Sequence, residues 1–197
     1  MSDPYKTDTA MLVRRGIILE YVTLGWNVVG VAVVFIAAIS ARSVALAGFG
    51  FDSLIEIFAS VIVVWQLKRI NKDKERLAER LIGFAFFGLA TYIIIQAAVV
   101  LYSGTHPRHS VLGIVWLTLT AIAMLLLAHG KKRTGGAIPN TVLQTEAKVT
   151  VIDAALAISV LAGLVINVVF GIWYADLLAA LVIVYYGLKE GLHAVRG

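Results

Sequence analysis

Residues 43–58, S-V-A-L-A-G-F-G-F-D-S-L-I-E-I-F, decide how this chain folds. They read as the first part of an apolar helix that continues to about Lys68, with Asp52 and Glu56 well inside it. Because the two acids are four residues apart, an α-helix places them on one face, one turn above the other. Carboxylates inside a membrane helix are costly and usually face a bundle interior or a water-filled path. The stretch therefore predicts a buried acidic site.

The composition is that of a membrane protein. Of the 197 residues, 60% are hydrophobic and 15% are charged, which is too apolar for an ordinary soluble domain. Apolar stretches of about 20 residues recur, the length needed to cross a hydrocarbon core of roughly 30 Å. The polar first residues do not resemble a cleavable signal peptide. The sequence has no cysteine, which excludes disulfides and thiolate metal sites.

We expect an all-α membrane protein with six transmembrane helices. The predicted spans cover residues 16–40, 43–67, 81–102, 110–128, 140–170 and, after a tight joint at 171–176, the chain to about 195. Residues 1–15 are expected to form a short cytoplasmic lead and residues 16–197 the transmembrane domain, with no C-terminal cytoplasmic domain. Charged loops are expected at 68–80 and 129–139.

The distribution of basic residues predicts the orientation. With six spans both termini share a side, and most lysines and arginines fall in segments on that side. The opposite loops hold only Arg42 and Arg108. The positive-inside rule then places both termini in the cytoplasm of a multi-pass inner-membrane protein. The net charge of +5 therefore reflects membrane topology, and no nucleic-acid partner is expected.

Further carboxylates lie in the predicted fifth span. Asp153 and, two turns earlier, Glu146 could join Asp52 and Glu56 in a site for a divalent cation, since carboxylate oxygens suit Mn²⁺, Fe²⁺ and Mg²⁺. In the alternative reading each acid is structural, either protonated or paired with a polar neighbour. The candidate neighbours are Asn27, Gln96 and Lys148.

No enzymatic motif accompanies these acids. The sequence contains no P-loop, no nucleotide-binding fingerprint and no nucleophile elbow. The four histidines fall at predicted span ends or in loops, where solvated interfacial roles are expected. We therefore expect a protein that is not an enzyme.

Several motifs resemble the membrane domain of the cation diffusion facilitator family. They are S-V-A-L and D-S-L-I-E in the second span and W-Y-A-D-L-L-A-A before the sixth. The resemblance implies a tetrahedral metal site built from pairs of residues on the second and fifth helices. By position the metal ligands are Asp52, Glu56 and Asp153, while the fourth position falls on Val149, which cannot bind a metal.

The resemblance implies a divalent cation transporter that exports its ion from the cytoplasm in exchange for protons. The substrate would be Mn²⁺, Fe²⁺, Zn²⁺ or a similar ion, with the lipid bilayer as surroundings and a homodimer as a candidate assembly. A site without histidine should favour harder cations over Zn²⁺. Glu146 could replace the missing ligand or line the approach to the site. In the alternative, Val149 marks a non-transporting or regulatory membrane subunit whose metal site has degenerated.

Overall fold

The structure, a computed structural model, describes residues 4–68, 72–104, 106–137 and 141–196. These residues form six α-helices and part of the connections between them, with no strand among them. The helices are α1 (Pro4–Ala41), α2 (Val44–Lys68), α3 (Lys72–Ser103), α4 (Val111–Ala137), α5 (Thr141–Phe170) and α6 (Tyr174–Arg196). The six predicted helices are all present, and the joint before the sixth covers residues 171–173, shorter than the predicted 171–176 because α6 begins at Tyr174.

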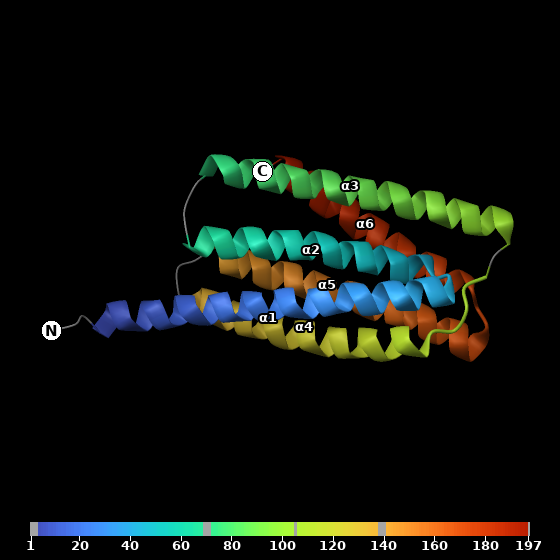
Figure 1. Cartoon of the computed structure of the whole chain (residues 1–197), viewed down its shortest axis with the longest axis horizontal. Helices are drawn as coiled ribbons and strands as arrows, with labels where there is room; N and C mark the ends of the chain where they lie inside the picture. Colours follow the sequence, from blue (N-terminus) through green and yellow to red (C-terminus); the bar gives the residue numbers. More distant parts are fainter. Residues whose placement is uncertain (1–3, 69–71, 105, 138–140, 197) are drawn as a thin grey trace.

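The helices form an elongated bundle in which consecutive helices run in opposite directions (Figure 1). Both termini therefore lie at the same end, which we call the terminal end. Helix α1 packs on α2 and α4, α4 packs extensively on α5, and α3 pairs mainly with α6. Helix α6 also contacts α5 and α2, whereas α2 and α5 contact each other only sparsely.

Small residues allow the central helices to approach closely. At Gly48 of α2, an added Cβ would lie 2.8 Å from Ile93 of α3 and 3.2 Å from Ile183 of α6. Both isoleucines are fully buried. Because interiors are packed nearly as densely as crystals, a side chain at this position would require the ends of both isoleucines to shift.

Serine side chains cap the N-termini of two helices at the end of the bundle opposite the chain termini. The Ser43 hydroxyl accepts a hydrogen bond from the Leu46 N–H (3.0 Å) at the start of α2. The Ser110 hydroxyl accepts one from the Gly113 N–H (3.0 Å) at the start of α4. Serine is favoured here because its oxygen satisfies an N–H group that has no partner within the helix.

Two segments predicted as charged loops are instead largely helical. Residues 72–80 form the first turns of α3, and residues 129–137 extend α4. For residues 72–80 the prediction was wrong because it treated charge as a sign of a loop, whereas Lys, Arg, Glu, Leu and Ala are all good helix formers. Residues 129–137 contain Gly130, Gly135 and Gly136, so packing within the bundle, and not local helix propensity, extends α4. The described part of the predicted lead, residues 4–15, is likewise helical and continuous with the first span.

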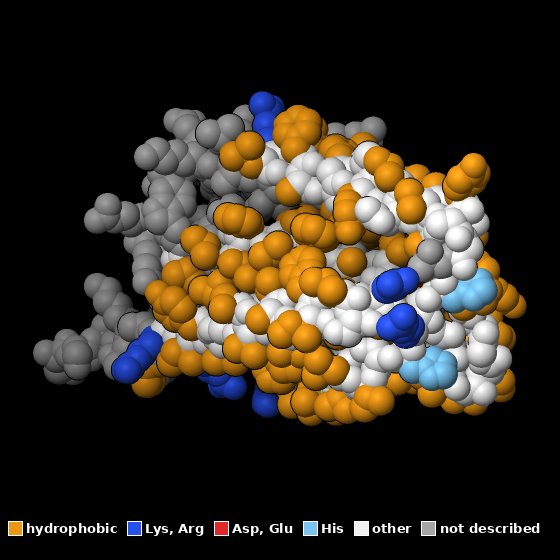
Figure 2. Space-filling view, turned by 45° about the vertical axis from the view of Figure 1, so that its right-hand side comes forward, with side chains coloured by type: hydrophobic (Ala, Val, Ile, Leu, Met, Phe, Trp, Pro, Cys, Tyr) orange, Lys and Arg blue, Asp and Glu red, His pale blue; other side chains and the backbone are white. Residues whose placement is uncertain are grey.

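The outer surface is apolar. Four helical segments of the described chain are long and apolar enough to cross a membrane, namely Met11–Ala41, Gly83–Ser103, Val111–Ala137 and Ala147–Phe170. Figure 2 shows hydrophobic side chains over much of one face, with no acidic side chain visible on its described part. The arrangement is that of an integral multi-pass membrane protein, whose apolar residues face lipid as well as each other.

Candidate metal site and its polar surroundings

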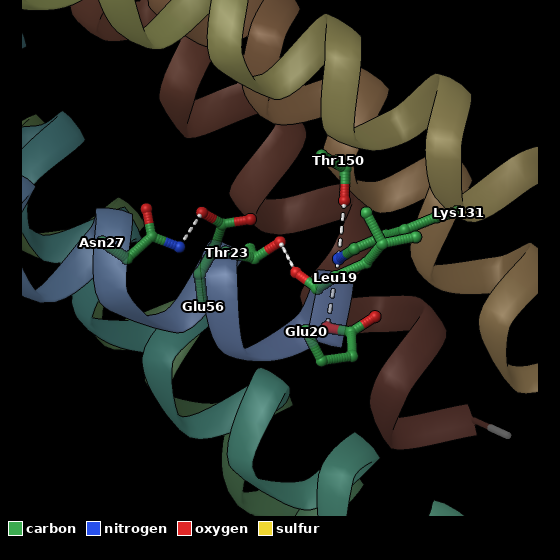
Figure 3. Close-up of polar contacts among 7 residues, drawn as sticks. All are labelled: Leu19, Glu20, Thr23, Asn27, Glu56, Lys131 and Thr150. Atoms are coloured by element: carbon green, nitrogen blue, oxygen red, sulfur yellow. Dashed lines mark hydrogen bonds and ion pairs between the residues drawn. The ribbon is translucent and has the colours of Figure 1, made fainter. Parts of the chain in front are cut away.

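Asp52 and Glu56 lie on the inner face of α2, as the four-residue spacing predicts. Their exposed fractions are 4% and 9%. The amide of Asn27 on α1 donates a hydrogen bond of 2.8 Å to Glu56 Oε2 (Figure 3). This is one of the pairings that the structural reading of the acids anticipated. Asp52 in turn interacts electrostatically with Glu56 and with Glu190 of α6.

Helix α1 contributes a buried polar stripe. Glu20, Thr23 and Asn27 recur at helical spacing and so share one face, and each is at most 2% exposed. Thr23 donates its hydroxyl hydrogen to the backbone carbonyl of Leu19 (3.0 Å), a bond within the helix. Glu20 and Asn27, in contrast, reach across to other helices.

At the terminal-end side of this stripe lies a buried ion pair. The Nζ atom of Lys131, on the extended part of α4, is 3.1 Å from Glu20 Oε2, and both side chains have no exposed surface. The same ammonium donates to the Thr150 hydroxyl of α5 at 3.1 Å. Figure 3 shows the three residues arriving from three helices. The sequence analysis placed Lys131 in a basic loop, and that placement was wrong.

Asp153 is also buried, with 5% of its surface exposed, one turn beyond Thr150 on α5. Val149, at the position of the missing ligand, is half-buried. No group of three or more His, Asp or Glu residues in the described part of the chain could hold a metal ion. The structure thus brings Asp52 and Glu56 together but does not gather them with Asp153 into a ligand set. The shared site stays a prediction, and the Glu146 side chain lies outside the described residues.

The sequence analysis missed Lys131 and Thr150 as partners of the polar stripe. A signal was available, because Glu20 lies inside a span and a buried ionised carboxylate needs a compensating partner. It was overlooked because ending the fourth helix near residue 128 removed Lys131 from consideration. Glu190 near Asp52 gave no comparable signal, since its position depends on how α6 packs.

The family-like motifs of α2 and α6 meet at the far end of the bundle. The Asp176 carboxylate, in the first turn of α6, accepts hydrogen bonds from the backbone N–H groups of Val44 (3.0 Å) and Ala45 (3.3 Å). It also accepts a hydrogen bond from the Ser43 hydroxyl. An anion at a helix N-terminus satisfies free N–H groups and complements the helix dipole. The S-V-A-L and A-D motifs are therefore two halves of one contact.

Comparison with known proteins assigns the chain to a family. The family model described as the cation efflux transmembrane domain matches residues 21–196, which include nearly all of the helical bundle. A search of curated proteins found no match. The matched range contains Asp52, Glu56, Asp153 and both halves of the Ser43–Asp176 contact. The chain therefore belongs to the cation efflux family, as the resemblance of its motifs predicted.

Proposed function

We propose that this protein exports a divalent metal cation from the cytoplasm in exchange for protons, using Asp52, Glu56 and Asp153. Its family carries metal cations across membranes, which supports a transporter similar to the cation diffusion facilitators. The observation that carries the proposal is the buried Asp52–Glu56 pair, one turn apart on an inner helix face. Buried carboxylates in a membrane bundle are typical of ion pathways.

Binding of the ion affects the hydrogen bond to Glu56. The Asn27 amide donates to Glu56 Oε2 in this conformation, so a metal ion that binds this oxygen competes with the amide for its lone pairs. Ligand oxygens lie about 2.0–2.6 Å from such cations, so the proposed site needs carboxylate oxygens of Asp153 and the α2 acids within roughly 5 Å of each other. Since α2 and α5 contact each other sparsely, few packed side chains oppose a shift of these helices toward each other.

Proton exchange follows from the chemistry of the ligands. A carboxylate binds the metal when ionised and can take a proton when the metal leaves. Rocking of helices around a site near the middle of the membrane would expose the acids alternately to the two sides, as in other secondary transporters. The terminal end, which carries most of the basic residues, is the proposed cytoplasmic end.

Vesicle transport tests the proposal. The purified protein in liposomes should move Mn²⁺ or Zn²⁺ at a rate that depends on an imposed pH gradient. Asp52→Asn and Asp153→Asn should each reduce the flux to the level of empty liposomes. The matched control neutralises Asp73, Glu75 and Glu79 together, because these acids alternate with basic residues outside the apolar segment. Wild-type flux no greater than that of empty liposomes would reject the proposal, as would Asp153→Asn transporting like wild type.

A further inference from the structure

The Glu20–Lys131–Thr150 cluster is not explained by stability alone. Both charged side chains are completely buried, and the desolvation penalty of such a pair can exceed its electrostatic attraction. Apolar residues of similar size often stabilise a protein equally well or better. Because stability does not account for the buried pair, the Lys131 ammonium is a candidate for a role in cation binding.

The neighbours of the ammonium have the chemistry of a cation site. A carboxylate oxygen of Glu20 and the hydroxyl oxygen of Thr150 each lie 3.1 Å from Lys131 Nζ. They come from α1 and α5, while the lysine reaches in from α4. Oxygen ligands from separate segments are those that hard cations such as Mn²⁺ and Mg²⁺ select. The ammonium thus stands where a small cation would be held.

A further buried oxygen lies on the same helix face. Thr134 follows Lys131 by almost one turn of α4 and is 2% exposed. Its hydroxyl has no hydrogen-bond partner among the residues that the structure describes. Since buried polar atoms are normally paired, such an atom indicates a site that another ligand or conformation completes.

The cluster lies between the terminal end and the acids of the proposed metal site. On α1, Glu20 precedes Asn27 by about 10 Å at about 1.5 Å per residue, and Asn27 contacts Glu56. On α5, Thr150 precedes Asp153 by almost one turn. A cation moving from the terminal end along these two helices reaches Glu20 and Thr150 before it reaches Glu56 and Asp153.

We propose that Glu20 and Thr150 form a second cation site, which the ammonium of Lys131 occupies in this structure and a divalent cation from the terminal end takes over during transport. The proposal rests on the proposed function, because it places this site on the route to the acids. Lys131 acts there as a tethered cation. It keeps Glu20 neutralised while no metal is present and gives way when a metal ion arrives.

Mn²⁺ binding to the full-length protein in detergent tests the site itself. Lys131→Met removes the ammonium and keeps an unbranched side chain that is one heavy atom shorter. It should bind one more Mn²⁺ than wild type in titration calorimetry. Glu20→Gln/Lys131→Met should lose that additional ion. Lys132→Met is the matched control, since Lys132 is the exposed neighbour on the same helix, and it should bind Mn²⁺ like wild type.

If Lys131→Met is too unstable for titration calorimetry, the effect of Mn²⁺ on its thermal unfolding provides a second test of the site. Mn²⁺ should raise the Tm of Lys131→Met by more than it raises the Tm of the double variant. Equal Mn²⁺ stoichiometry and equal Tm shifts in the two variants would overturn the inference and leave the pair a structural contact.

Transport kinetics test the place of the site on the route. The neutral Glu20→Gln/Lys131→Met variant should transport Mn²⁺ with a KM raised about tenfold, equivalent to roughly 1.4 kcal/mol, and with little change in maximal rate. An unchanged KM would remove the cluster from the route. This result differs from failure of the proposed function, in which wild-type protein itself transports no metal.

Discussion

At the scale of single residues, the Asn27 amide donates one buried hydrogen bond to a carboxylate oxygen of Glu56, Oε2. We expect Asn27→Leu to lower the stability of the protein by about 1–3 kcal/mol, because a buried oxygen loses a donor. Metal then no longer competes with the amide for Oε2, so Mn²⁺ affinity should rise about fivefold, or roughly 1 kcal/mol. Thermal unfolding and titration calorimetry measure the two effects.

Asn167 provides the matched control for this experiment. It is 4% exposed and donates one side-chain hydrogen bond, to the Pro107 carbonyl at 3.2 Å, far from the acids. Asn167→Leu should reduce stability to a similar extent while leaving Mn²⁺ affinity unchanged. If both variants alter the affinity equally, the effect comes from general loosening of the bundle.

Val149 offers a second test at this scale. It lies one turn before Asp153 on α5 and is half-buried. If the proposed site forms as the family resemblance implies, Val149→His would supply a fourth ligand, and imidazole nitrogen binds Zn²⁺ at about 2.0–2.1 Å. We expect Zn²⁺ affinity to rise at least about tenfold in titration calorimetry, and Asp153→Ala to abolish the gain. Unchanged Zn²⁺ binding would mean that position 149 does not face the acids.

At the scale of helices, close contact between α5 and α6 depends on Gly163. An added Cβ at this position would lie 2.9 Å from the Ala175 carbonyl oxygen and 2.9 Å from the Ala179 Cβ. Because backbone cannot yield as a flexible side chain can, Gly163→Ala should force the helices apart and lower the Tm. The cost should be about 1–3 kcal/mol, as is usual for overpacking.

Gly88 on α3 is the control for that substitution. No atom lies within 4 Å of a Cβ built there, and the residue is exposed. Gly88→Ala should therefore be neutral or should stabilise the helix by up to about 1 kcal/mol. A fall in Tm for Gly88→Ala as large as that for Gly163→Ala would show that the loss of stability does not come from the close contact between α5 and α6.

The helices themselves were largely predictable, whereas their polar contacts were not. Apolar length located all six helices, and the breakers Gly104 and Pro107 lie in the connection between the third and the fourth. The contact between Lys131 and Glu20 joins residues 111 positions apart, and no local pattern encodes such a pairing. Asp52 and Glu56 were placed correctly because their contact lies within one helix. The approach of Asp153 depends on how two helices pack, which spacing alone cannot determine.

At the scale of the whole molecule, the antiparallel order of the helices places both termini at one end (Figure 1). We expect this end to face the cytoplasm, since the loops at the other end carry few basic residues. Fluorescent and phosphatase reporters fused to each terminus measure the orientation. The fluorescent reporter should fluoresce at either terminus, and the phosphatase reporter should be inactive at either terminus. Activity of either phosphatase fusion would contradict the six-span topology in this orientation.

The contact between Asp176 and the start of α2 has a mechanical consequence. It anchors α2 to α6 at the end away from the termini, so a tilt of α2 would turn about Ser43 as a lever turns about its fulcrum. At about 1.5 Å per residue, Asp52 lies roughly 13 Å and Glu56 roughly 20 Å along this arm. A tilt of about 10° would then carry Asp52 by about 2 Å and Glu56 by about 3 Å. Glu56 therefore moves farther than Asp52, and a displacement of about 3 Å would break its hydrogen bond to Asn27.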